Sequence, residues 1–325
     1  MIDISILFSK VVLLLLMIVP GFLMAKGKLS TPGLCKGIAN VILYAAQPAL
    51  IIKGYIREYD TEVLTRALQV LIYALITHLL FILLAFVVFR NGDIARRRVL
   101  RFATVFTNAG YMGIPLICAI FDDEYAIYAS IYVIVFNIFC WSLGAFIYTD
   151  EKKYISPRKM FLNPASLATY VGLILFLTPL NRLIAPLGES HTMADILRAI
   201  PYDLIDGLQA TVAPLSMLLI GLRLAEIDFR GILRDKQMYW YLVLRLLISP
   251  ALIWGVMRLC TLVGLLNDGV VMTVILLSAA TPAATATTMF AEKYDGDSVY
   301  ASKLVSVSTI LSLVTMPTVA LLLNV

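Results

Sequence analysis

Long apolar runs alternate with short polar connections along almost the whole chain. A helix needs about 20 apolar residues to cross about 30 Å of hydrocarbon at a rise of about 1.5 Å per residue. Ten segments meet this requirement, so the pattern predicts ten membrane-spanning helices, numbered here as spans 1 to 10. They cover residues 4–25, 34–54, 64–89, 99–120, 125–148, 163–180, 204–224, 237–260, 268–290 and 298–323.

The composition agrees with this pattern. Hydrophobic residues make up 61% of the 325 residues, charged residues only 14%, and the mean hydropathy is +0.90. These values lie outside the range of soluble globular domains. The first apolar run lacks a basic segment before it and is too long for the core of a signal peptide, so we expect it to be retained as a span. The sequence therefore predicts an all-α polytopic membrane protein.

The charges predict the orientation of the chain. Lys and Arg are concentrated in the connections between spans 1 and 2, 3 and 4, 5 and 6, and 7 and 8, including RNGDIARRR and EKKYISPRK, whereas the turn between spans 4 and 5 is the acidic FDDEY. By the positive-inside rule these basic connections, together with the one between spans 9 and 10, are cytoplasmic, and both termini lie on the outer side of the cytoplasmic (inner) membrane. The net charge of +5 reports on these connections and indicates no nucleic-acid partner.

The ten spans divide into two halves of five. The first half, the basic cytoplasmic linker and the second half are residues 1–150, 151–162 and 163–325. An odd number of spans in each half inserts the second half upside down, which is the inverted-repeat plan of many secondary transporters. Prolines support this alignment, because Pro48 and Pro214 are 166 residues apart and Pro115 and Pro282 are 167 apart. With 13 prolines in the chain, one such match can also arise by accident.

Spans 4 and 9 contain residues that interrupt a helix. Span 4 carries TNAGYMGIP and span 9 carries SAATPAATATT, at corresponding places in the two halves. A proline inside a helix frees backbone groups, and in hydrocarbon these groups need partners. Breaks that face a cavity near the midplane present the positive N-termini of half-helices to a ligand. The pattern predicts a binding site, although Gly and Pro kinks used only for helix packing are the alternative.

The side chains around these breaks form the predicted binding site. Asn108 offers a donor and an acceptor, and three threonines of span 9 recur on one helical face, where they can also bond to the carbonyl four residues earlier. Gln47 is either part of the site or a link between helices. Arg245, inside span 8, either faces an anion or reaches back to the interface. The residues predicted to bind substrate are Gln47, Asn108, Gly110, Tyr111, Met112, Pro115, Arg245, Thr281, Pro282, Thr285 and Thr288.

Missing motifs exclude several classes of function. No Asp or Glu falls in the middle of any predicted span, and Asp206 at the start of span 7 is the deepest. Cation exchangers usually carry such acids as ion ligands or proton relays. The sequence has no HExxH, GxSxG or Walker loop, and its four cysteines have no metal-ligand spacing. We therefore expect no catalytic residue, metal or cofactor, and an anionic or neutral organic substrate.

Three stretches resemble the auxin efflux carrier family, which includes the plant PIN exporters and bacterial permeases for malate, malonate and related organic acids. They are FTNAGYMGIPL in span 4, APLSMLLIGLRLA in span 7 and SAATPAATATTMFAEKY in span 9. The resemblance implies a ten-helix inverted-repeat fold similar to that of the bile acid/sodium symporters, in which spans 4 and 9 cross at Pro115 and Pro282. It also implies that spans 1, 2, 6 and 7 form a scaffold that makes a homodimer, while spans 3–5 and 8–10 form a mobile transport unit.

Together these observations predict a secondary transporter, an exporter or a uniporter, for a small organic anion such as a mono- or dicarboxylate or an auxin-like acid. An elevator-type slide of the transport unit in the lipid bilayer would give alternating access. The short linker and the Ala/Thr-rich span 9 favour a bacterial-type carrier. Two alternatives stay open, namely a sodium- or proton-coupled symporter of the same fold and a membrane receptor that binds the anion without moving it.

Overall fold

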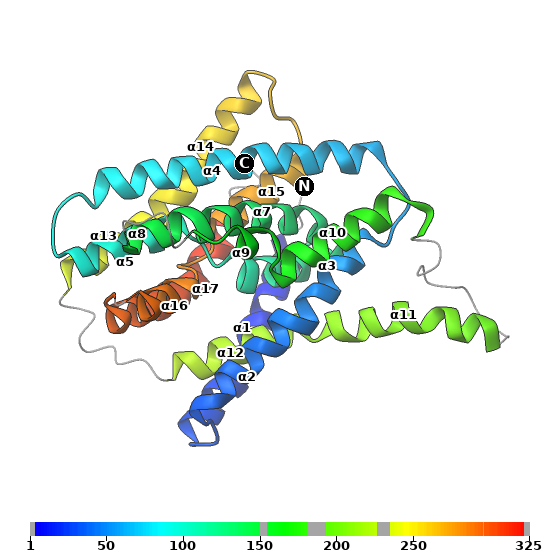
Figure 1. Ribbon diagram of the computed structural model, residues 1–325, viewed down its shortest axis with the longest axis horizontal. Helices are drawn as coiled ribbons and strands as arrows, with labels where there is room; N and C mark the ends of the chain where they lie inside the picture. The colour runs from blue at the N-terminus through cyan, green and yellow to red at the C-terminus, as the bar shows by residue number, and fades with distance from the viewer. Residues whose placement is uncertain (1–3, 150–154, 181–192, 226–234, 295, 322–325) are drawn as a thin grey trace.

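The computed structural model describes residues 4–149, 155–180, 193–225, 235–294 and 296–321, and within these ranges the chain is helical and forms no strand (Figure 1). The prediction of an all-α protein is therefore confirmed. The elements of the first half are α1 (Ile4–Lys26), α2 (Pro32–Val41), η1 (Ile42–Ala46), α3 (Gln47–Tyr55), α4 (Thr61–Val88), α5 (Ile94–Val105), η2 (Ala109–Gly113), α6 (Ile114–Ile120), η3 (Asp123–Tyr125), α7 (Ala126–Phe139), η4 (Cys140–Gly144) and α8 (Ala145–Thr149). The linker and the second half contribute α9 (Pro157–Phe161), α10 (Pro164–Leu177), α11 (Met193–Ala210), α12 (Val212–Leu224), α13 (Lys236–Val243), η8 (Leu244–Ile248), α14 (Ser249–Leu262), α15 (Gly269–Ala280), α16 (Ala286–Lys293) and α17 (Ser298–Leu321).

Each predicted span falls on one or more of these helices. Six continuous helical segments of the described chain are long and apolar enough to cross a membrane, namely Gly33–Tyr55, Thr61–Val88, Asp123–Thr149, Ala199–Leu224, Lys236–Leu262 and Ser298–Ala320. Shorter apolar helices cover Val12–Lys26, Ala109–Ile120, Pro164–Leu177 and Gly269–Ala280. The ten-span inverted repeat itself stays a prediction. The helix of span 7 begins at Met193, earlier than the predicted residue 204.

Widened turns accommodate three of the prolines inside spans. The π-helical turns η1, η2 and η8 each end two residues before a proline, at Pro48, Pro115 and Pro250. In each turn the residue before the proline donates its N–H to the carbonyl five residues earlier. A proline donates no such bond and its ring crowds the carbonyl four residues back, so the wider turn removes the clash without ending the helix.

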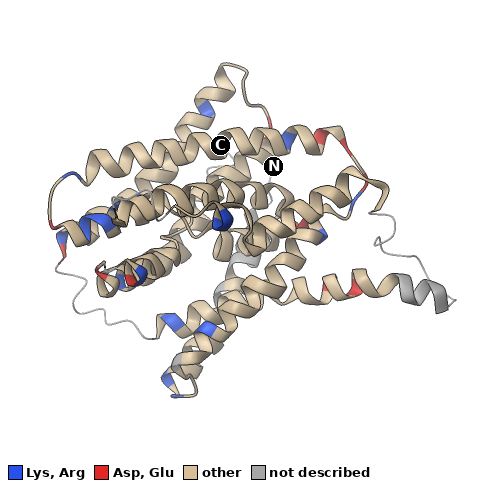
Figure 2. Cartoon of the chain, viewed as in Figure 1, with Lys and Arg blue, Asp and Glu red and all other residues tan. Residues whose placement is uncertain are grey.

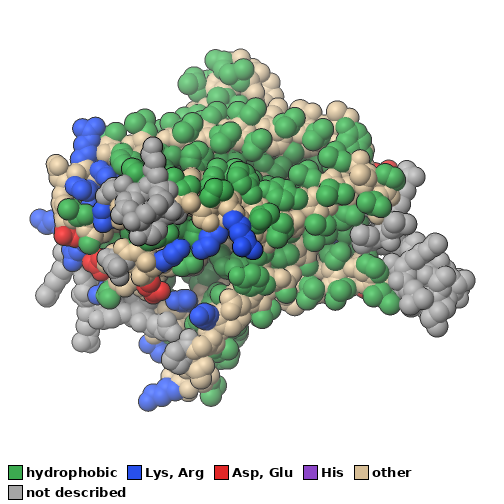
Figure 3. All heavy atoms as spheres, in the orientation of Figure 1, with side chains coloured by type: hydrophobic (Ala, Val, Ile, Leu, Met, Phe, Trp, Pro, Cys, Tyr) green, Lys and Arg blue, Asp and Glu red, His purple; other side chains and the backbone are tan. Residues whose placement is uncertain are grey.

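The surface matches a lipid environment. On α4, the long horizontal helix at the top of Figure 1, large apolar side chains are exposed along one stripe, at spacings of three and four residues: Leu68, Ile72, Leu75, Leu79, Leu83 and Val87. Apolar side chains cover much of the middle of the face in Figure 3, and many Lys and Arg side chains gather toward its left end (Figures 2 and 3), where Figure 1 labels α5. An apolar surface this wide is typical of contact with acyl chains rather than water.

Glycines allow α1 and α12 to pack backbone against backbone. A Cβ atom added at Gly21 would lie 2.2 Å from the carbonyl oxygen of Leu218, and one added at Gly221 would lie 2.1 Å from that of Ile18. No side chain fits at these distances, so the two glycines set the separation of the helices. Close approach through small residues is a common way for helices to associate where the solvent is itself apolar.

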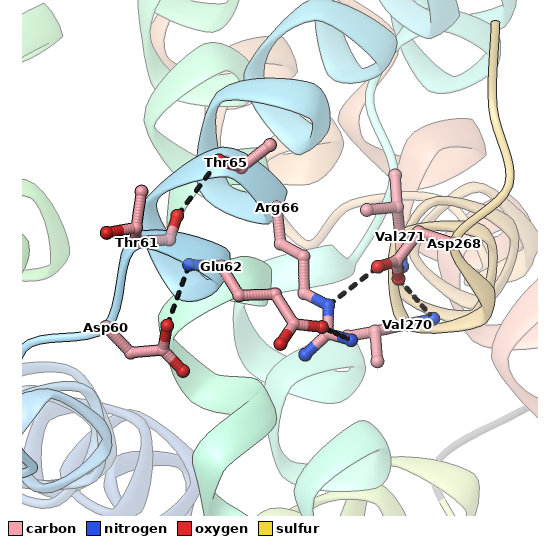
Figure 4. Close-up of polar contacts among 8 residues, drawn as sticks. All are labelled: Asp60, Thr61, Glu62, Thr65, Arg66, Asp268, Val270 and Val271. Atoms are coloured by element: carbon pink, nitrogen blue, oxygen red, sulfur yellow. Dashed lines mark hydrogen bonds and ion pairs between the residues drawn. The ribbon is translucent and has the colours of Figure 1, made fainter.

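A polar cluster ties α4 to α15 at their N-terminal ends (Figure 4). The carboxylate of Asp268 accepts hydrogen bonds from the N–H groups of Val270 and Val271, at 2.8 and 3.1 Å, and so caps α15. Its other oxygen accepts a 2.7 Å bond from Nε of Arg66, whose Nη2 contacts Glu62 in the same helix. Capping and ion pairing by one carboxylate fix the relative position of the two helices.

We predict that Gly221→Ala lowers the stability of the purified protein by about 1–3 kcal/mol, because the added methyl group forces α1 and α12 apart. Thermal unfolding followed by intrinsic fluorescence measures the effect. Gly207→Ala is the matched control, since a Cβ at Gly207 in α11 meets nothing within 4 Å. The control should be neutral or stabilising, by up to about 1 kcal/mol. Equal melting temperatures for wild type and Gly221→Ala would contradict the close packing.

Candidate binding site at the crossing of two broken helices

The two broken helices cross and pair through their unwound segments. The chain is non-helical at 106–108, between α5 and η2, and again at 281–285, between α15 and α16. Thr107 and Ala283 form an antiparallel bridge. The N–H of Asn108 donates to the carbonyl of Pro282 at 2.9 Å, and the N–H of Ala284 donates to that of Phe106 at 3.0 Å. Each break thus supplies the hydrogen-bond partners that the other lacks in an apolar surrounding.

The crossing corrects one expectation. Pro282 lies at the crossing, but Pro115 does not, because it belongs to the first turn of α6, beyond η2. The break in span 4 falls instead at 106–108, so spans 4 and 9 do not cross at both prolines. The physical reason is the π turn η2, which accommodates Pro115 within a continuous helix. The half-helix N-termini accordingly begin at Ala109 and Ala286.

A cavity of about 250 Å³ opens beside the crossing, at these two N-termini. Polar lining residues come from η2, α12, α16 and α17, or directly precede η2 and α16, and are Asn108, Tyr111, Ser216, Arg223, Thr285, Thr288, Glu292, Ser302, Ser306 and Thr309. Apolar groups complete the wall, namely Ala39, Ile42, Met112, Leu219, Ile220, Leu224, Met289, Val305 and Ile310. A small apolar-walled space with a few convergent polar groups is typical of a site for a small molecule.

Asn108 occupies the deep end of the cavity. It is 6% exposed, and its backbone N–H and carbonyl are already used, by Pro282 and by Met112 and Gly113 respectively. Its side-chain amide forms no hydrogen bond with another residue of the described chain and borders the cavity. A buried amide without a protein partner is costly unless a ligand or water completes it. This amide is therefore available to a polar group of a small molecule in the cavity.

Thr285 and Thr288 contribute hydroxyl groups from the start of α16. Thr285 is the residue before the first turn of that helix, and its side chain makes no capping bond there. The first turns of α16 and η2 both leave N–H groups without partners inside the helix, and the dipole makes each such end positive. The deep end of the cavity thus combines two positive helix ends with hydroxyl and amide donors, an arrangement suited to a carboxylate.

Charged side chains occur only at the mouth. Arg223, near the end of α12, and Glu292, near the end of α16, are exposed, whereas Asn108 and Ser216 are buried. The cavity therefore opens at the end where the predicted cytoplasmic connections follow these two helices. The part of the cavity wall that α17 forms was not predicted from the sequence. One signal was present, because Ser302, Ser306 and Thr309 recur at i, i+4 and i+7 on one face of α17.

Five of the predicted binding residues line the cavity: Asn108, Tyr111, Met112, Thr285 and Thr288. The others lie behind it. Gln47 of α3 donates from Nε2 to the carbonyl of Gly110 at 2.8 Å, so it links two helices at the break. The hydroxyl of Thr281 donates to the carbonyl of Ser278 at 2.8 Å and thus bonds within its own chain segment. Pro115, Pro282 and Arg245 also stay outside the cavity lining.

Arg245 is fully buried and reaches neither the interface nor the cavity lining. Its guanidinium donates to carbonyl oxygens of Thr281 at 3.1 and 2.9 Å, of Ala279 at 2.6 Å and of Thr104 at 3.3 Å. These carbonyls belong to the C-terminal ends of α15 and α5. The guanidinium carbon also lies 4.9 Å from the centroid of the Phe81 ring. The group therefore binds backbone at the negative ends of both N-terminal half-helices.

At the end opposite the mouth, ion pairs join α3 to η3 and α11. Nζ of Lys53 lies 3.0 Å from Oδ2 of Asp123 and 2.5 Å from Oδ1 of Asp206. Nη1 of Arg57 lies 2.7 Å from Oε2 of Glu124. These pairs lie at the predicted extracytoplasmic ends of their helices. They join segments of both halves of the chain. None of the residues in these ion pairs lines the cavity.

A bundle of apolar-surfaced helices with two broken members that cross beside a polar cavity defines a polytopic membrane protein of the transporter class. The sequence profile of the family described as membrane transport protein matches residues 6–320, and the chain belongs to this family. The match confirms the resemblance to the auxin efflux carrier family and shows that the protein is a membrane transporter and not an enzyme. Among curated proteins, none matches the chain.

Ser308 of α17 stabilises the crossing through a hydrogen bond. Its hydroxyl accepts a 3.3 Å bond from the N–H of Ala283 and donates to the carbonyl of Val305 at 3.0 Å. We predict that Ser308→Ala lowers the stability by about 1–3 kcal/mol, because it leaves the N–H of Ala283 buried without a partner. Ser302→Ala, on the same helix but bordering the cavity, should leave the melting temperature unchanged. Equal melting temperatures for both variants would contradict this role of Ser308.

Proposed function

We propose that this protein is a secondary carrier, an exporter or uniporter, of a small organic anion such as a mono- or dicarboxylate or an auxin-like acid. The observation that carries the proposal is the side chain of Asn108, a residue only 6% exposed, whose amide has no partner in the described chain and borders a cavity at the N-termini of two half-helices. The family supplies transport as the function, and the cavity supplies the chemistry of the substrate.

The carboxylate of the substrate binds at the deep end. The amide N–H of Asn108 and the hydroxyls of Thr285 and Thr288 donate hydrogen bonds to it, and the positive ends of η2 and α16 stabilise its charge. The apolar wall accommodates the organic part. Arg223 at the mouth attracts anions from the cytoplasmic side and thereby raises the rate at which the substrate binds. A volume of about 250 Å³ accommodates a small acid.

Alternating access comes from an elevator-type slide between two units of an inverted repeat. The scaffold comprises α1–α3 and α10–α12, which would also form the homodimer, and the transport unit comprises α4–α8 and α13–α17. Contacts support the division, because α1 packs on α12, and α3 on α10 and α11, while α4 packs on α5, α7 and α15. The cavity lies between the units, with Ile42 and Ser216 on one wall and Asn108 and Thr285 on the other. A slide therefore carries half of the site across the membrane.

We predict that Asn108→Ala reduces transport by about 100-fold, to background, because the carboxylate loses a donor that no other residue replaces. Currents on a solid-supported membrane carrying the purified protein measure this loss, with malate, malonate, other dicarboxylates and indole-acetate added in turn. Thermal unfolding establishes that the variant folds. Asn137→Ala is the matched control: Asn137 is also buried in a span but bonds to Asn163 at 3.2 Å, outside the cavity lining.

Asn137→Ala should keep its current per folded molecule. Wild-type currents in folded Asn108→Ala protein would remove the proposed site. A wild-type protein that is thermally stabilised by one of these acids, yet accumulates none of them in proteoliposomes with or without an imposed gradient, would favour a receptor over a carrier.

A further prediction concerns the side of the membrane to which the cavity opens. With the four native cysteines replaced by alanine, Ser306→Cys in the cavity wall should react with a membrane-impermeant thiol reagent faster from the cytoplasmic side than from outside. Lys53→Ala, which removes both ion pairs of Lys53, should raise the outside rate because it releases the closed end. Val263→Cys, exposed at the predicted outer end of span 8, is the control for sidedness. Faster labelling of Ser306→Cys from outside would contradict the assignment.

A further inference from the structure

Four backbone carbonyl bonds converge on one buried site between the broken helices. The last carbonyls of a helix have no partner within the helix and carry the negative end of its dipole. Here two such ends, those of α5 and α15, lie close enough for one guanidinium to bond to both. In carriers with discontinuous helices, unwound carbonyls and half-helix C-termini of this kind coordinate a coupling cation such as Na⁺.

Arg245 fills this site from a third segment of the chain. It projects from the π turn η8 of span 8 and is 0% exposed, and within the described chain its side chain donates hydrogen bonds to the carbonyls of Thr104, Ala279 and Thr281. No carboxylate of the described residues forms an ion pair with it. An arginine stays protonated in proteins, so its charge is balanced by carbonyl dipoles and by the face of Phe81.

The geometry points to Arg245 as a tethered cation that takes the place of a diffusible one. The guanidinium bonds to the carbonyl oxygens that Na⁺ or K⁺ would need as ligands. It also links the two half-helix C-termini, and this link positions η2 and α16, the segments that follow them, around the cavity. It is a positioning residue and touches no substrate. The consequence is that the crossing is complete without Na⁺ or K⁺, and the carrier works without either. This inference rests on the crossing and holds whichever anion is carried.

The test is thermal unfolding of the purified protein in choline, sodium, potassium and guanidinium chloride at one ionic strength and at non-denaturing concentrations. Wild type should melt at the same temperature in all four salts. Arg245→Ala should melt lower in choline and regain about 4 °C in sodium or guanidinium, because a free cation now binds the vacated carbonyls. A structural loss alone would lower the melting temperature without making it depend on the cation.

Arg258→Ala is the matched control. Arg258 lies in α14 of the same span, and its guanidinium carbon is 5.5 Å from the centroid of the Trp254 ring, but its Nε has no hydrogen-bond partner in the described chain. Its removal deletes the same charge without opening a carbonyl site, so the variant should show no difference among the salts. Arg245→Lys, which keeps the charge and loses the fork, should melt between wild type and Arg245→Ala and also ignore the cation.

Three results would overturn the inference: an Arg245→Ala protein as stable as wild type, one destabilised equally in all salts, or a wild-type protein stabilised by sodium over choline. If Arg245→Ala does not fold, the responses of wild type and Arg245→Lys decide, since sodium dependence in either contradicts a tethered cation. None of these measurements needs a substrate, so their failure is distinct from failure of the proposed carrier. Where a substrate current is found, it should survive replacement of sodium by choline in wild type.

Discussion

The structure depends on the pairing of two unwound backbone segments with each other. Two backbone hydrogen bonds flank the bridge between Thr107 and Ala283. They join Asn108 to Pro282 and Ala284 to Phe106. In hydrocarbon each unpaired amide or carbonyl costs several kcal/mol. A few such groups without hydrogen-bond partners therefore cost about as much as the whole net stability of a domain. A single broken helix at this depth is therefore unstable, whereas two that cross satisfy one another. The crossing explains why polar and helix-breaking residues occur in both halves of the chain.

The crossing also sorts the ends of the half-helices by charge. The two C-terminal ends meet at Arg245, and the two N-terminal ends meet at the cavity. Neighbouring helices complete the remaining groups, with Gln47 on the carbonyl of Gly110 and Ser308 on the N–H of Ala283. The backbone thus produces positive potential at the cavity without a basic side chain at the deep end, where an unpaired charge would be costly.

The sequence predicted the helices and the polar break better than it predicted the partners of individual side chains. The position of Asn108 and Thr285 beside a cavity could be predicted because a polar group beside a helix break has few purposes in a membrane. The role of Arg245 could not, since hydropathy gives neither the depth of a side chain nor the carbonyls it meets. Pro115 was misplaced because a proline predicts a disturbance of the helix without distinguishing a π turn from a break. The serine face of α17 was overlooked because isolated hydroxyls in a span usually bond to their own backbone.

Placing the fixed charge behind the breaks rather than inside the cavity has a consequence for movement. A basic side chain in the cavity would need an anion or a carboxylate beside it in every state, and an empty site would then resist transfer across the hydrocarbon. In the proposed elevator cycle, Arg245 keeps its carbonyl partners if α5, α13–α14 and α15 move together, and the hydrogen bonds that join these segments favour such movement. In the proposed cycle, the charge that changes is then that of the substrate alone. The structure thus combines a crossing whose one buried charge is bound by carbonyl groups with a cavity whose deep polar groups are uncharged.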